Sequence, residues 1–155
     1  MRKVAESNWN GAIFAAAGLE RIDLRPPNSI DLDWMLPAPS QGAIMVACRE
    51  GDDCSFDACQ PFNDELTALC TKLEKDFLRV LMGGCSTPVS ALAQMSNNKI
   101  FFRGNICSTD GVESISVNGE LPMPESENLG VAMANQLLQN TKAQKILHTI
   151  QDARN

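Results

Sequence analysis

The residue best suited to chemistry in this sequence is a cysteine that directly follows two glycines. Gly83, Gly84 and Cys85 lie within LMGGCSTPVSALA, residues 81–93, between a helical pattern and a strand pattern. Because glycine has no side chain, another group can approach the backbone and the sulfur closely at this point. The same spacing also fits a glycine helix cap followed by a buried cysteine, and free cysteines are most often buried. From spacing alone, burial is the favoured interpretation of Cys85.

The setting of Cys85 does not favour a strongly activated thiolate. The cysteine follows the C-terminal end of a predicted helix, where the negative end of the helix dipole disfavours an anion. The single histidine, His148, is far away in the sequence. A cysteine-protease or thioredoxin-like role is therefore unattractive, whereas a thiol that reacts once and stays bonded needs less activation.

The other five cysteines form no pattern of metal ligands or redox pairs. No Cys-x-x-Cys pair occurs among them, and a structural zinc site usually needs ligands paired at short spacing. No secretory signal supports an oxidising compartment, so we interpret them as free thiols in a reducing cytosol. They are Cys48, Cys54, Cys59, Cys70 and Cys107. The sequence predicts no metal site.

Composition and charge narrow the classes of protein. The chain has 155 residues, of which 44% are hydrophobic, and a formal net charge of -6. An acidic chain gives no electrostatic footprint for nucleic acid or anionic lipid. No run approaches the roughly 18 apolar residues that a membrane span needs. We therefore expect a cytoplasmic protein that binds neither nucleic acid nor membrane.

The elements that would position Cys85 form a small α+β unit. From Asn63, a predicted N-cap, apolar residues recur on one helical face until the two glycines. Three predicted strands follow, at 87–95, 99–107 and 112–120, and the turn signals SNN and STDG join them into an antiparallel meander. Two further amphipathic helices end the chain. We expect a three-stranded antiparallel sheet covered by helices on one face.

The first third of the chain has a different pattern. AIFAAAG, residues 12–18, and residues 44–48 each predict a short buried strand, with a helical turn after the first. A strand–helix–strand unit of this size cannot bury its own sheet. This part is therefore predicted to be a partial α/β segment of a larger protein.

Four blocks carry a resemblance to a known family. AAAGLERI, LPAPSQGAIMVACRE, FLRVLMGGCSTPVSALA and FRGNICSTDG occur in this order and cover most of the chain. The series resembles the C-terminal half of the hydroxymethylbilane synthase family, also called porphobilinogen deaminases. The resemblance implies a transferase that condenses four porphobilinogen units into hydroxymethylbilane with loss of ammonia. It also implies that Cys85 carries a dipyrromethane cofactor through a thioether.

The resemblance carries over to four further residues. Arg21 matches a family arginine of the active-site cleft, where guanidinium pairs well with the carboxylates of porphobilinogen. Gln41 and Gly42 match the family's GQGA element, which borders the same cleft, and Gly84 would let the cofactor rings approach the backbone. Two positions depart from the pattern: Ser40 replaces a glycine, and Lys75 replaces an arginine.

The resemblance also implies an organisation and a missing partner. Residues 1–36 would be a remnant of the second lobe, residues 37–59 a strand and linker returning to the first, and residues 60–155 the cofactor-binding domain. The family's catalytic aspartate belongs to the N-terminal half, so we assign no catalytic residue in this chain. We expect the chain to be inactive alone, to need that half and porphobilinogen, and to self-associate through its orphan strands.

Two other classes of function remain open from the residues themselves. A helix-covered sheet is a common scaffold, so a non-enzymatic binding or oligomerisation module is one alternative. A thiol redox protein is the other, and it would require a low pKa or a resolving partner at Cys85.

Overall fold

The computed structural model describes residues 2–81 and 87–152 of the chain. It divides into two compact units, Met1–Met35 and Leu36–Asn155. The first unit contains the short helices α1, Arg2–Glu6, and α2, Ala16–Arg21. The elements of the second unit are α3 Asp53–Cys59, α4 Glu65–Val80, β1 Val89–Ser96, β2 Lys99–Cys107, β3 Ser114–Pro122, α5 Leu129–Leu138 and α6 Thr141–Asp152, with 3-10 turns η1 Gln60–Phe62 and η2 Met123–Asn128.

The three strands form one antiparallel sheet in the order β1-β2-β3. Asn97 and Asn98 connect β1 to β2, and both have positive φ, 50° and 59°. Two consecutive residues with positive φ form a two-residue hairpin turn whose twist matches that of the flanking strands. Asparagine tolerates this conformation. The turn sets the register that pairs Ser96 with Lys99, so alternate side chains of β2 reach the core. The predicted meander is confirmed.

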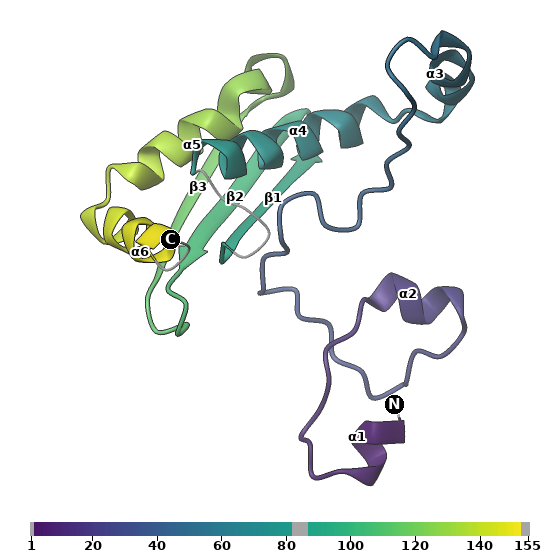
Figure 1. Cartoon of the computed structure of the whole chain (residues 1–155), viewed down its shortest axis with the longest axis vertical. Coiled ribbons are helices and arrows are strands. Elements are labelled where there is room, and N and C mark those ends of the chain that lie inside the picture. The colour runs from purple at the N-terminus through teal and green to yellow at the C-terminus, as the bar shows by residue number, and fades with distance from the viewer. Residues whose placement is uncertain (1, 82–86, 153–155) are drawn as a thin grey trace. The chain divides into compact units, whose positions relative to one another are not determined.

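Helices α4 and α5 lie side by side over one face of this sheet, and α6 also contacts β2 and β3 (Figure 1). The buried stripe of α4 includes Leu73 and Phe77, and the Phe77 ring packs 5.3 Å from that of Phe102. Gly104 makes room for this ring, since a Cβ there would lie 2.6 Å from Phe77 Cζ. The core is therefore a single layer between helices and sheet, as the α+β prediction requires.

The contact between α4 and α5 depends on Gly130. A Cβ built on this residue would lie 2.0 Å from the backbone carbonyl oxygen of Leu73. Such a distance is far inside van der Waals contact, so the two helices approach this closely only because residue 130 has no side chain.

The two strands predicted in the first third of the chain are wrong. The stretch 12–15 has no regular structure and α2 begins at Ala16, while residues 44–48 belong to no helix and to no strand of the described sheet. Their side chains face solvent: Ile13 is 75% exposed and Ile44 is 79% exposed. A strand forms only when neighbouring strands accept and donate its backbone hydrogen bonds, and the described residues offer none here.

The start of α4 also differs slightly from the prediction. Its N-cap is Asp64 rather than Asn63, and the Asp64 carboxylate accepts a hydrogen bond from the backbone N–H of Thr67. The bond lowers the pKa of Asp64 because it stabilises the charged form. None of the helices in the described parts of the chain has both the length and the apolar character of a membrane span.

Candidate functional site

The residues of the predicted cofactor attachment, Gly83, Gly84 and Cys85, lie outside the described residues. The described flanks on both sides are well packed. Leu81, just after α4, is buried, and Pro88, just before β1, accepts a hydrogen bond from Cys107 N through its carbonyl oxygen at 2.9 Å. The segment that carries Cys85 therefore joins two firmly held elements of the sheet unit.

Gln41 and Gly42 lie in a short loop, residues 37–42, that we call the Gln41 loop. Gln41 closes it twice: its backbone N–H donates to Ala38 O, and its side-chain Oε1 accepts from Ala38 N, both at 3.0 Å. Its Nε2 makes no hydrogen bond to any described residue and can donate to a ligand. Gly42 has φ +86°, and a Cβ built on it would meet no atom within 4 Å, so its backbone conformation is what favours glycine there.

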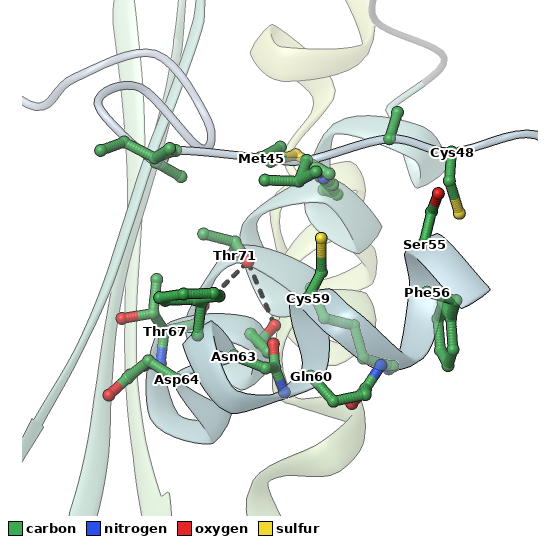
Figure 2. Close-up of a pocket in the computed structure, with 18 of the residues that line it drawn as sticks. Met45, Cys48, Ser55, Phe56, Cys59, Gln60, Asn63, Asp64, Thr67 and Thr71 are labelled. Carbon is green, nitrogen blue, oxygen red and sulfur yellow. Dashed lines mark hydrogen bonds between the residues drawn. The ribbon is translucent and has the colours of Figure 1, made fainter. Parts of the chain in front are cut away.

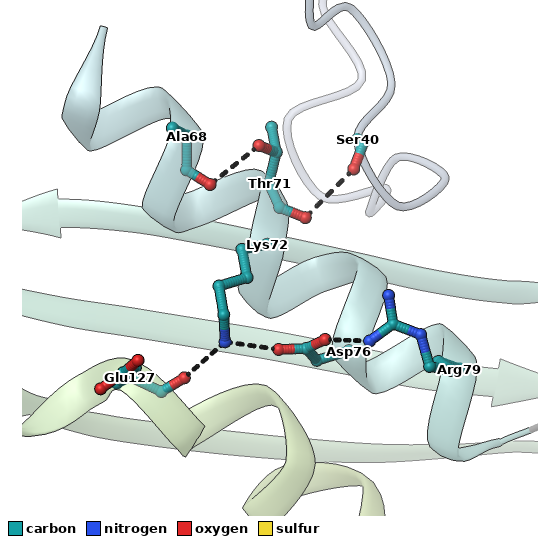
Figure 3. A network of polar contacts seen from close by, with 7 residues as sticks. All are labelled: Ser40, Ala68, Thr71, Lys72, Asp76, Arg79 and Glu127. Carbon is teal, nitrogen blue, oxygen red and sulfur yellow. Dashed lines mark hydrogen bonds and ion pairs between the residues drawn. The ribbon is translucent and has the colours of Figure 1, made fainter. Parts of the chain in front are cut away.

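Ser40 shows how the loop accommodates its departure from the family pattern. It has φ +61°, in the left-handed region where glycine is normally preferred. Its hydroxyl donates to the backbone carbonyl of Thr71 on α4 at 3.3 Å (Figure 3). The serine thus takes up the backbone conformation that suits glycine and adds a bond to α4.

Glu74 is the residue of this region that sequence reasoning missed. Its Oε2 accepts from Ser40 N at 2.6 Å, and its Oε1 accepts from Ala93 N on β1 at 2.8 Å. Next to it, Ala91 N donates to Pro37 O at 3.1 Å. The edge of β1 opposite β2 is therefore closed by the loop and by one carboxylate. The sequence does hold a signal for this residue: Glu74 is an acidic residue on the apolar face of α4, next to Leu73 and three residues before Phe77.

Glu74 affects the ionisation of Cys70, which lies one turn earlier on α4. Burial raises the pKa of Glu74, against the opposing effect of its two backbone hydrogen bonds. Burial also raises the pKa of the Cys70 thiol, and the negative charges of Glu74 and Asp64 raise it further. Cys70 is thus held as a neutral, weakly reactive thiol.

This leads to a prediction for thiol reactivity. At mildly alkaline pH, iodoacetamide should modify Cys48 and Cys54, both exposed, at least about tenfold faster than Cys70, which has less access and less thiolate. Peptide mapping of a time course measures the three rates. Modification of Cys70 as fast as Cys54 would contradict the burial and charge environment assigned to it.

A second polar network lies on the other side of α4. The Asp76 carboxylate, almost fully buried, accepts from Lys72 Nζ at 2.8 Å and from Arg79 Nη1 at 2.5 Å (Figure 3). The bond from Lys72 lowers the pKa of Asp76 most strongly. Lys72 Nζ also donates to Glu127 O in η2 at 3.1 Å. Lys72 therefore connects α4 to η2, while its ion pair and that of Arg79 with Asp76 lie within α4.

Arg21 belongs to the first compact unit and is exposed on the last turn of α2. It makes no ion pair with a described residue. The nearby Arg25, in contrast, pairs with Glu20 and donates from Nη2 to both carboxylate oxygens of Asp31 at 2.6 and 2.7 Å. Of these two arginines, Arg21 is the one whose guanidinium can pair with an external carboxylate.

A groove of about 1140 Å³ lies between residues 43–49 and the helical segment α3, η1 and α4 (Figure 2). Met45 and Phe56 contribute apolar surface, and Thr67 and Thr71 line it from α4. The Gln41 loop borders a separate hollow of about 450 Å³ with Glu74 and Cys70. Within the described ranges, no three His, Cys, Asp or Glu side chains come together as a set of metal ligands.

Comparison with known proteins identifies the class of protein. Residues 68–139 match the family model described as porphobilinogen deaminase, C-terminal domain, and residues 1–56 match the one described as porphobilinogen deaminase, dipyromethane cofactor binding domain. The chain belongs to the porphobilinogen deaminase family, which confirms the resemblance seen in the four sequence blocks.

Individual relatives show how much of the family protein is present. The chain is similar to the porphobilinogen deaminase of Syntrophotalea carbinolica, with 36% identity over 140 residues, covering 89% of this chain and 44% of the relative. Those of Brevibacillus brevis and Helicobacter hepaticus are 36% and 34% identical, each with 89% of this chain and 45% of the relative covered. The chain therefore spans about half the length of these relatives.

Proposed function

We propose that this chain is the C-terminal part of a hydroxymethylbilane synthase, the transferase that condenses four porphobilinogen units with loss of ammonia. The observation that carries the proposal is the match over residues 68–139, which contains the Gly83, Gly84 and Cys85 element. A second match, over residues 1–56, contains the elements of Arg21 and Gln41. All the residues carried over from the family thus lie within matched segments.

In this proposal Cys85 holds the dipyrromethane group through a thioether. In the attachment, a carbon–nitrogen bond of porphobilinogen breaks and a carbon–sulfur bond forms at the same methylene carbon. The amino group leaves as ammonia, and the proton that it gains is the one lost by the thiol. When bound, the dipyrromethane group supplies the primer to which further pyrroles are added. A thiol that reacts once in this way does not need the low pKa of a turnover nucleophile.

The described residues fit the chemistry of such a ligand. Porphobilinogen carries acetate and propionate arms, which call for cationic donors in the cleft. Arg21 is exposed and makes no ion pair with a described residue, so it is free to bind a carboxylate in a bidentate manner. Gln41 keeps its Nε2 donor available while its Oε1 stabilises the loop. We assign these two residues to substrate and cofactor binding, and not to proton transfer.

The proposal includes a partner, the amino-terminal half of the enzyme. Ile44, Met45 and Val46 are between 69% and 79% exposed, an apolar run that water solvates poorly. The relatives are about twice as long as this chain, and we propose that their additional half packs against this apolar run. Because we assign no catalytic aspartate in this chain, we propose that it is inactive until that half is supplied.

An intact-mass measurement tests the proposal. The purified chain is incubated with porphobilinogen and with the amino-terminal half of a relative, and peptides around Cys85 are mapped. The expected adduct on Cys85 equals two porphobilinogen units less two ammonia molecules, and hydroxymethylbilane is expected to accumulate. A thiol that stays unmodified in the mixture, with no product, would reject the transferase function for this chain.

A further inference from the structure

Glu74 lies where the Gln41 loop, α4 and β1 meet, and each of its carboxylate oxygens bonds a different segment. We propose that Glu74 is a positioning residue: it clamps the Gln41 loop to β1 and so fixes Gln41 on the sheet unit. The positioning of Gln41 for catalysis rests on the proposed function, whereas the clamp itself rests only on the geometry of the loop.

The two bonds of Glu74 connect segments that are far apart in sequence. Ser40 N, at 2.6 Å from Oε2, is 34 residues away, and Ala93 N, at 2.8 Å from Oε1, is 19 residues away. Both donors are backbone N–H groups, which are directional and held by the chain. A single side chain thus joins three parts of the unit, and its own position is set by the middle of α4.

The charge of Glu74 has no counter-cation among the described residues. The side chain is 5% exposed and forms no ion pair there, while the adjacent Lys75 directs its Nζ to Met45 Sδ at 3.2 Å. A buried carboxylate without a cation costs folding free energy, in agreement with the direction in which burial moves its pKa. A neutral apolar residue would fill the same space without this cost. What only a carboxylate provides is two acceptor oxygens for two facing N–H groups.

The clamp reaches Gln41 through the next peptide bond. Ser40 N is held by Glu74, and Gln41 in turn bonds Ala38 through both its N–H and its Oε1. Because these bonds close the loop on itself, a restraint on Ser40 also restrains Gln41. Holding Ser40 therefore also fixes the direction of the Gln41 Nε2 donor.

The substitution Glu74→Gln distinguishes two roles of this residue, a hydrogen-bonding clamp and a side chain that only fills space. It has nearly the shape of glutamate, but only one acceptor oxygen, and its amide N–H₂ would face one of the two backbone donors. A space-filling role would survive Glu74→Gln, whereas the clamp would lose one bond. The matched control is Glu113→Gln, because Glu113 is exposed and its carboxylate makes no hydrogen bond to a described residue.

Amide hydrogen exchange followed by NMR on the full chain tests the clamp. In the unmodified chain we expect Ser40 and Ala93 amides to be protected. In Glu74→Gln, exchange at Ser40, Gln41 or Ala93 should become at least about tenfold faster, with buried α5 amides such as Leu137 unchanged. The clamp would be overturned if the Ser40 amide exchanged without protection in the unmodified chain. It would also be overturned if the exchange rates in Glu74→Gln equalled those of the unmodified chain. The first of these outcomes does not depend on the variant folding.

Steady-state kinetics with the amino-terminal half tests the positioning of Gln41. We expect Glu74→Gln to lower kcat at least about fivefold and Glu113→Gln to leave kcat and KM unchanged. If amide exchange becomes faster in Glu74→Gln while kcat and KM stay unchanged, the functional part of the inference is overturned. If the unmodified chain itself forms no product, the proposed function fails, and the exchange data still decide the clamp.

Discussion

Replacing Gly130 by alanine is expected to destabilise the sheet unit by about 3 kcal/mol. The new methyl carbon would lie 2.0 Å from Leu73 O, a backbone atom that cannot turn away as a side chain can. Alanine favours a helix over glycine by about 1 kcal/mol, so helix propensity alone predicts the opposite sign. The clash is larger, because relieving it requires α5 to move away from α4 and to open the core between them.

Thermal unfolding followed by circular dichroism measures this effect, and a loss of this size lowers Tm by roughly 10 °C. The matched control is Gly18→Ala in α2, where the new Cβ would meet only Ala15 Cβ at 3.9 Å. That variant should keep the unfolding transition of the sheet unit unchanged. A Gly130→Ala chain as stable as the unmodified one would contradict the close approach of the two helices.

Replacing Cys85 by serine is expected to have the largest effect on activity. In the mixture with the amino-terminal half, the rate of hydroxymethylbilane formation should fall roughly a thousandfold or more, because serine oxygen does not replace the thiol as a nucleophile here. The mass adduct of two pyrrole units should be absent. Both quantities are measured on the same samples, by product absorbance and intact mass.

The control for this variant is Cys54→Ser. Cys54 is an exposed cysteine of α3 and has no part in the proposed chemistry, so adduct and rate should stay as in the unmodified chain. If Cys85→Ser retained the adduct and the activity, attachment at Cys85 would be wrong. If Cys54→Ser also lost the adduct and the activity, the loss would reflect a general effect of replacing a cysteine. The assignment of the attachment to Cys85 would then fail.

The sheet and its helices could be predicted because local signals and tertiary packing agree. Alternating side chains and the Asn97–Asn98 turn specify the hairpin, and the apolar stripe of α4 matches the face that it buries. The strands expected at 12–17 and 44–48 failed because an apolar run shows only that burial is favourable. Whether it becomes a strand depends on neighbours that the run itself does not reveal.

The candidate site was predictable only in part, for a related reason. Cys85, Arg21, Gln41, Gly42 and Gly84 were assigned to the site through a resemblance and stay predictions, and three of them, Arg21, Gln41 and Gly42, lie among the described residues. Glu74 belongs to no motif, and its role depends on the N–H of Ser40, 34 residues away. A charged residue on the buried stripe of an amphipathic helix is nevertheless a signal that can be sought, because burial of a charge requires partners.

The closed edge of β1 has a consequence for dissecting the protein. A domain cut at residue 60, the boundary that the resemblance implies, would keep Glu74 but discard Pro37, whose carbonyl oxygen accepts the hydrogen bond of Ala91 N–H. An uncovered edge strand invites pairing between molecules, so such a fragment would tend to aggregate on expression. A cut before Leu36, where the second compact unit begins, keeps Pro37 against the edge of β1, and we expect that fragment to aggregate less than the shorter one.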